Sequence, residues 1–129
     1  FFEIGGKVYF VDLPGYGYAR ADFKKKEKIK KLIIWYLTSG EARPALVALI
    51  TDIQAGFTDF DKEVLRIIQG QDHPYVIVAN KVDRLNQKEA VRELIRMKKE
   101  SGEAEIFPHS AKTKAGTDVL RNKLLEVCG

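Results

Sequence analysis

The sequence predicts an α/β fold in which a mostly parallel β-sheet is covered by helices on both faces, in three layers. Strand-like and helix-like patterns alternate along the chain, and this order builds a parallel sheet. Two of the runs, VALIT at residues 47–51 and YVIVA at residues 75–79, are continuously apolar rather than alternating. Such runs are typical of strands that are buried on both faces.

Four apolar runs bounded by polar or glycine-containing stretches are predicted as strands. They are Lys7–Val11, Ala45–Asp52, Tyr75–Ala79 and Glu105–Pro108. Upstream of the first strand, residues 1–4 and the pair Gly5-Gly6 predict a β-hairpin that leads into it.

Helices are predicted between and after these strands from the spacing of apolar residues. Three of them cover about 24–38, 58–70 and 117–127. The remaining one has Asn86 as its N-cap and Glu89 three residues later, which is the pattern of a capping box.

The composition is that of one globular domain over residues 1–129, with 45% hydrophobic and 31% charged residues. No apolar stretch reaches the roughly 18 residues that a membrane span requires, and we expect no secretory leader. Cys128 is the one cysteine in these residues, which excludes a disulfide framework and a cysteine-based zinc site. We therefore expect a cytoplasmic, monomeric protein with no membrane partner.

Short motifs follow three of the predicted strands at their carboxyl ends. Asp12-Leu13-Pro14-Gly15 follows the first strand, Asn80-Lys81-Val82-Asp83 follows residues 75–79, and Ser110-Ala111-Lys112 follows residues 105–108. In open parallel sheets, ligands bind beyond the carboxyl ends of the strands. Each motif alone is a weak signal, but in this order they predict one nucleotide site.

The second and third motifs supply what a guanine-reading pocket needs. The Asp83 carboxylate would accept hydrogen bonds from N1 and the exocyclic amine of guanine, a donor pair that adenine lacks. A pocket built around this pair rejects the wrong base, because a polar group would be left unpaired. Asn80 would donate to the base and tie neighbouring loops together. Lys81 and Lys112 would lay their aliphatic stems along the ring faces, and the backbone N–H of Ala111 would meet the guanine carbonyl.

The first motif suits the phosphate end of a guanine nucleotide. Asp12 would hold Mg²⁺ through a water molecule, since this ion keeps much of its hydration shell. Gly15 would let the main chain approach the γ-phosphate, and its N–H would be a donor only when that phosphate is present. The expected cofactors are therefore GTP or GDP and Mg²⁺. The alternative is that Asp12 caps a turn formed by Pro14 and Gly15.

The string VDLPGYGYA at residues 11–19, followed by a lysine-rich helix, resembles the EngB family (also called YihA or YsxC) of translation-factor-related GTPases. Residues 52–61 are similar to the family's segment between strand and helix, so the resemblance covers essentially the whole chain. It implies a Ras-like P-loop GTPase fold and a GTPase switch that assists assembly of the large ribosomal subunit. A requirement for cell division, septation and growth is also implied. By this resemblance, Asp12 and Gly15 belong to switch II, Asn80, Lys81 and Asp83 to the guanine-specificity motif, and Ser110, Ala111 and Lys112 to the last motif.

The sequence departs from the pattern of Ras-like GTPases at two places. Tyr16 stands where those proteins carry a water-orienting glutamine, which implies slow intrinsic hydrolysis. The phosphate-binding loop G-x-x-x-x-G-K-[ST] does not occur in the 129 residues, and the switch I threonine is missing too. We therefore expect the C-terminal portion of a GTPase domain, from the hairpin before switch II to the last helix. Alone, these residues are not expected to hydrolyse GTP at a useful rate.

Positive charge gathers before and within the first predicted helix, at Arg20, Lys24, Lys25, Lys28 and Lys31. Such a cluster favours phosphate backbones, and with the resemblance it predicts contact with ribosomal RNA or the large subunit. The alternative is a solvated helix face. Trp35 is interpreted as a core residue rather than a base-stacking platform. His109 has no metal-binding partner at usable spacing and is interpreted as a structural or surface residue.

Three functions stay open from the sequence. The first is a GTPase switch whose nucleotide state controls docking to the ribosome. The second is a non-catalytic RNA- or ribosome-binding module that retains the guanine-reading half of a GTPase domain. RNA affinity that falls steeply with salt, whatever nucleotide is present, would favour it. The third is a flavodoxin-like or receiver-like domain, which needs an acidic cluster or a flavin loop that the sequence lacks.

Overall fold

The computed structural model describes residues 2–4, 8–10, 23–39 and 45–128, and it divides into two compact units, residues 1–43 and 44–129. The prediction that residues 1–129 form one domain stays a prediction. None of the helices among the described residues is long and apolar enough to cross a membrane.

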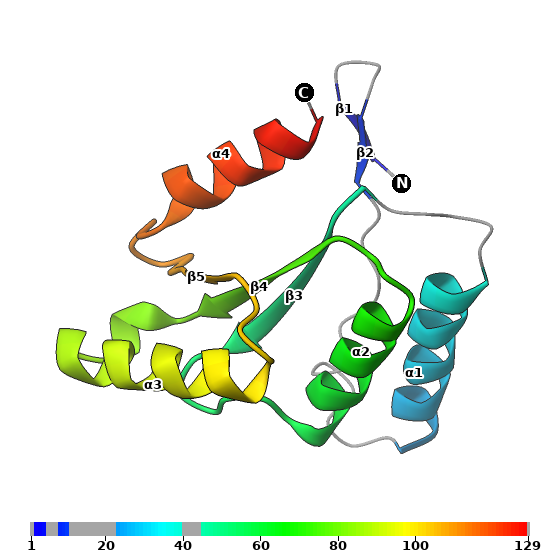
Figure 1. Ribbon diagram of the computed structural model, residues 1–129, viewed down its shortest axis with the longest axis horizontal. Helices are drawn as coiled ribbons and strands as arrows, with labels where there is room; N and C mark the ends of the chain where they lie inside the picture. Colours follow the sequence, from blue (N-terminus) through cyan, green and yellow to red (C-terminus); the bar gives the residue numbers. More distant parts are fainter. Residues whose placement is uncertain (1, 5–7, 11–22, 40–44, 129) are drawn as a thin grey trace. The chain divides into compact units, whose positions relative to one another are not determined.

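The first unit contains a β-hairpin and one helix (Figure 1). Strand β1 (Phe2–Ile4) pairs antiparallel with β2 (Val8–Phe10), with Phe2 opposite Phe10. This pairing confirms the hairpin that residues 1–4 and the glycine pair predict. Helix α1 covers Phe23–Thr38, within one residue of the predicted start.

The interpretation of Trp35 as a core residue is wrong, because its side chain is 54% exposed. Residues three, four and seven apart share a face of a helix. Trp35 therefore lies on the face of Lys28 and Lys31, which are exposed, whereas Ile33 and Leu37 are buried.

The second unit is built on a three-stranded parallel sheet in the order β3-β4-β5 (Figure 1). The strands are β3 (Val47–Asp52), β4 (Tyr75–Asn80) and β5 (Ile106–Pro108). Val47 lies opposite Tyr75, and Ile77 lies opposite Ile106. All the carboxyl ends of these strands therefore meet at one edge of the sheet.

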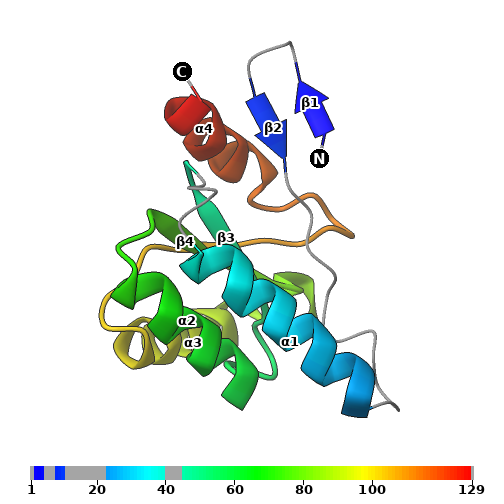
Figure 2. The same ribbon diagram turned by 90° about the vertical axis from the view of Figure 1, so that its right-hand side faces the viewer.

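The helices of the second unit are α2 (Asp59–Gly70), α3 (Gln87–Glu100) and α4 (Thr117–Cys128). The connection from β3 through α2 to β4 and the connection from β4 through α3 to β5 both lead to the next strand in the same direction across the sheet. Because such crossovers are right-handed, α2 and α3 lie on the same face of the sheet. Figures 1 and 2 show α4 on the other side of the strands. This arrangement confirms the predicted α/β fold with a parallel sheet and helices on both faces.

Burial differs between the two continuous apolar runs. In β4, residues 76–79 are each at most 3% exposed, so this strand is buried on both faces as predicted. In β3, Leu49 and Thr51 are buried but Ile50 is 62% exposed. The expectation of burial on both faces is therefore wrong for β3. It is the end strand of the described sheet, and α2 packs on it from one side.

Capping boxes set the starts of α2 and α3. Thr58 Oγ1 accepts a hydrogen bond from Asp61 N at 3.1 Å, and the Asp61 carboxylate accepts one from Thr58 N at 2.9 Å. Burial raises the pKa of the Asp61 carboxyl, although the bond from Thr58 lowers it. Asn86 and Glu89 make the same reciprocal pair at 2.8 and 3.1 Å, which confirms the predicted capping box. Asn86 lies shortly after the Asn80–Asp83 motif, so this cap sets where α3 begins beyond the motif.

Candidate functional site

The loops that follow β4 and β5 meet at the carboxyl edge of the sheet. After β4 the chain turns sharply, because Lys81 takes the left-handed backbone conformation at φ 67° and residues 82–84 form a 3₁₀ turn. The N–H of Val82 donates to the carbonyl of His109 at 3.1 Å, and the N–H of His109 donates to the carbonyl of Ala79 at 2.9 Å. These bonds join the Asn80–Asp83 motif to the Ser110–Lys112 motif.

Asp83 and Ser110 are joined by their side chains. The Ser110 hydroxyl is fully buried and donates to Asp83 Oδ1 at 2.7 Å. This bond is the main reason why the pKa of the Asp83 carboxyl lies below its ordinary value, and the charges of Lys112 and Arg84 also lower it. Asp83 is therefore ionised at neutral pH. A carboxylate accepts about four hydrogen bonds, so most of its capacity stays available after Ser110 is bound.

Ser110 also organises the loop that leads to α4. Its hydroxyl oxygen accepts a hydrogen bond from Thr113 N at 3.1 Å, and its own N–H donates to the carbonyl of Ala115 at 3.0 Å. Gly116 then turns the chain with φ +79°, close against the backbone of Pro108. The loop therefore folds back on the end of β5 and holds Ala111 and Lys112 beside Asp83.

These two loops line a half-open hollow with a volume of about 440 Å³. It falls in the range of about 300–1,000 Å³ that is usual for small-molecule sites. The hollow is lined by Asn80, Lys81, Asp83, Arg84, Ala111 and Lys112. All of these except Arg84 are predicted site residues, and the position of Arg84 directly after Asn80–Asp83 is the signal that points to it. The buried Ser110 stands behind the hollow and holds Asp83.

Lys81 crosses this edge of the sheet toward β3. Its ammonium nitrogen lies 3.3 Å from Asp52 Oδ2 at the end of that strand. Asp52 Oδ1 accepts a hydrogen bond from Gln54 N at 2.8 Å. The pKa of the Asp52 carboxyl is lowered: its partial burial acts to raise it, but the bonds from Gln54 and Lys81 outweigh that effect. Both partners are partly exposed, so the ion pair serves to orient Lys81 more than to stabilise the fold.

The remaining predicted site residues belong to the first unit or are not described by the structure. Asp12, Leu13, Pro14, Gly15 and Arg20 lie outside the described residues, so the phosphate and Mg²⁺ contacts stay predictions. Lys24 and Lys25 lie in α1, but their side chains are not described, whereas those of Lys28 and Lys31 are exposed. Within the described part of the chain, no three His, Cys, Asp or Glu side chains gather as they would around a metal ion.

Comparison with known proteins identifies the family. The chain is 38% identical over 116 residues to a probable GTP-binding protein EngB of Solibacter usitatus, covering 90% of this chain and 59% of that protein. It is 35% identical over 127 residues to the probable EngB of Mycoplasmopsis synoviae, covering 96% of this chain and 67% of that protein. The chain belongs to the EngB family. No protein-family model matches it.

The fold comparison agrees with this membership. A crystal structure of a probable EngB matches with a TM-score of 0.75 at 22% identity, over 91% of this chain and 76% of that one. At this level of identity the likeness concerns the fold. The chain spans 59% of the length of the Solibacter usitatus EngB and 67% of that of the Mycoplasmopsis synoviae EngB.

Proposed function

We propose that this chain reads the base of a guanine nucleotide, GDP or GTP, in the hollow between the loops after β4 and β5. One observation carries the proposal: Asp83 lines the hollow with its pKa lowered and its carboxylate held by buried Ser110. Guanine presents the donors N1–H and N2–H₂ side by side, and an ionised carboxylate is the acceptor that matches both. Adenine has no such pair.

The other lining groups suit the same base. Asn80 offers amide donors. Lys81 and Lys112 have aliphatic stems long enough to cover an aromatic ring, while Asp52 holds the ammonium group of Lys81 and that of Lys112 stays in water. Membership of a family whose members are named GTP-binding proteins supports this assignment. For the whole protein we further propose a cytoplasmic GTPase switch, with Mg²⁺ held through Asp12. GTP hydrolysis needs the phosphate-binding loop G-x-x-x-x-G-K-[ST], which residues 1–129 do not contain. The wider proposal therefore requires that loop elsewhere in the protein.

Nucleotide competition tests the base assignment. Protein produced from the complete reading frame is saturated with a fluorescent GDP analogue, and GDP and ADP are then added separately. GDP should displace the analogue at a concentration about a hundredfold lower than ADP, since ADP would leave the ionised Asp83 unpaired. Equal displacement by the two nucleotides, or no binding by folded protein, would contradict the proposal.

We also propose that α1 contacts ribosomal RNA of the large subunit, as part of a role in ribosome assembly and cell division. Lys28, Lys31 and the exposed Trp35 share one face of this helix. Cations beside an exposed aromatic side chain suit RNA, because the cations meet phosphates and the ring can stack on an unpaired base.

Charge reversal tests the RNA proposal. Lys28→Glu with Lys31→Glu should weaken binding to large-subunit RNA by about tenfold or more at physiological salt, and should reduce its salt dependence. Lys88→Glu with Lys99→Glu makes the same charge change at exposed positions of α3 and serves as the control. The proposal fails if both double variants bind the RNA equally well.

A further inference from the structure

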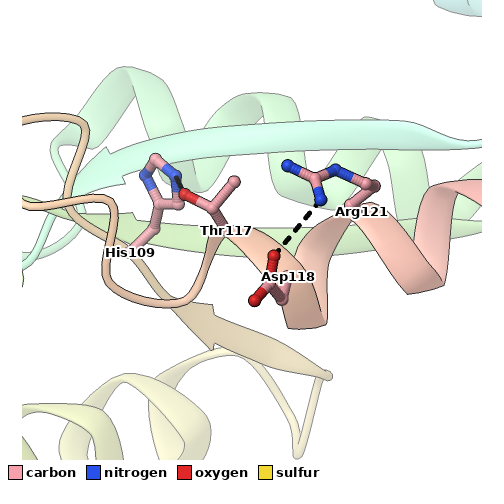
Figure 3. Close-up of polar contacts among 4 residues, drawn as sticks. All are labelled: His109, Thr117, Asp118 and Arg121. Atoms are coloured by element: carbon pink, nitrogen blue, oxygen red, sulfur yellow. Dashed lines mark hydrogen bonds and ion pairs between the residues drawn. The ribbon is translucent and has the colours of Figure 1, made fainter.

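His109 links the candidate guanine site to the start of α4. It follows β5 directly and is partly buried. Its Nδ1 lies 3.2 Å from Oδ1 of Asn80, and its Nε2 lies 3.3 Å from Oγ1 of Thr117, the first residue of α4. Figure 3 shows the ring beside Thr117, with Asp118 and Arg121 paired further along the helix.

The partners of the two ring nitrogens determine which of them carries a hydrogen. The amide oxygen of Asn80 can only accept, so Nδ1 of His109 carries a hydrogen and donates it. In the neutral ring, Nε2 then has a lone pair and accepts the hydroxyl hydrogen of Thr117. One tautomer therefore satisfies both neighbours. The Asn80 amide is fixed with its oxygen toward His109 and its NH₂ group directed elsewhere.

Backbone hydrogen bonds hold His109 beside Asn80. The N–H of His109 donates to Ala79, and its carbonyl accepts from Val82, at 2.9 and 3.1 Å. These two residues stand on either side of the Asn80-Lys81 pair in the sequence. The backbone of His109 is therefore bonded to the short segment 79–82, and its imidazole contacts the side chain of Asn80 within that segment.

We propose that His109 is a positioning residue of the guanine site, which orients the Asn80 amide so that its NH₂ group donates to N7 of the purine. This inference rests on the proposed function. N7 is an acceptor on guanine and adenine alike, so the contact would add affinity for the nucleotide without selecting the base. Asp83 selects the base, and His109 sets the strength of a second contact on the other edge of the ring.

The test compares GDP with 7-deaza-GDP, which carries a carbon in place of N7. Affinities are measured by competition against the fluorescent GDP analogue, using protein from the complete reading frame. Wild-type protein should prefer GDP to 7-deaza-GDP by about three- to tenfold, the range for one hydrogen bond. His109→Ala should lose this preference, because its affinity for GDP falls while its affinity for 7-deaza-GDP stays the same.

Two further variants separate positioning from folding. In His109→Asn the amide nitrogen takes the place of Nδ1, so the preference for GDP should return. In His109→Gln the amide reaches the place of Nε2 near Thr117 but not Asn80, so the preference should stay lost even if His109→Ala does not fold. An equal loss of affinity for both nucleotides in His109→Ala and His109→Gln would overturn the inference, since a purely structural role predicts it.

Wild-type results distinguish this inference from the function on which it rests. If wild-type protein binds GDP and 7-deaza-GDP equally well, the contact with N7 is refuted while guanine binding stands. If folded wild-type protein binds neither, the proposed function fails and the role of His109 fails with it.

Discussion

Replacing Asp83 with asparagine should lower the affinity for GDP by about a hundredfold and raise the affinity for XDP. An asparagine amide keeps one acceptor oxygen but places an NH₂ group opposite the guanine amine, so one donor of the base loses its partner. Hydrogen bonds to a charged group contribute about 1.5–3 kcal/mol each, which sets this magnitude. Xanthine has a carbonyl where guanine has the amine, and the new NH₂ group can donate to it.

The fold should survive this substitution, because Ser110 can still donate to the asparagine oxygen in place of Asp83 Oδ1. Asp72→Asn is the matched control. Asp72 is exposed and has φ 56°, a backbone conformation that asparagine tolerates well. Competition with GDP and XDP measures both variants. Unchanged GDP affinity in Asp83→Asn would show that another group reads the base.

Gly116→Ala should unfold the loop behind the site and lower the free energy of unfolding by about 3 kcal/mol or more. A Cβ atom at this position would collide with the carbonyl oxygen of Pro108, which is backbone and cannot rotate away. The left-handed φ of +79° adds about 1 kcal/mol of strain for alanine. Overpacking of this kind typically costs about 1–3 kcal/mol. Since the loop carries Ala111 and Lys112, GDP affinity should fall as well.

Gly102→Ala measures the cost of a left-handed backbone at alanine without a steric clash of the added Cβ atom. Gly102 has φ +74°, nearly that of Gly116, but nothing lies within 4 Å of an added Cβ atom. This variant should lose only about 1 kcal/mol and bind GDP as wild-type protein does. Urea denaturation and GDP competition measure both variants. Equal losses of stability in the two would mean that the contact between Gly116 and Pro108 does not constrain the loop.

Local patterns predicted much of this fold. The apolar, β-branched run before Asn80 predicts a buried strand, and β4 is buried as that pattern indicates. Asn86 and Glu89 cap α3 through contacts three residues apart, which a sequence displays directly. The hollow brings together Asn80, Asp83, Ala111 and Lys112, because the ends of neighbouring parallel strands meet at one edge.

Contacts between residues far apart in sequence were not predictable in this way. The pairing of Lys81 with Asp52 depends on the register of β3 against β4. The contact between His109 and Asn80 arises because β5 ends beside Asn80, a relation that no spacing within the sequence reveals. The exposure of Trp35 follows from which face of α1 is buried, and both faces of that helix carry apolar residues.

A crystal structure of the protein with GDP bound would test the central claim most directly. The guanine ring should lie between the loops after β4 and β5, with N1 and N2 both within hydrogen-bond distance of the Asp83 carboxylate. The stems of Lys81 and Lys112 should flank the ring. A base bound away from Asp83, or turned so that neither donor faces its carboxylate, would contradict the assignment.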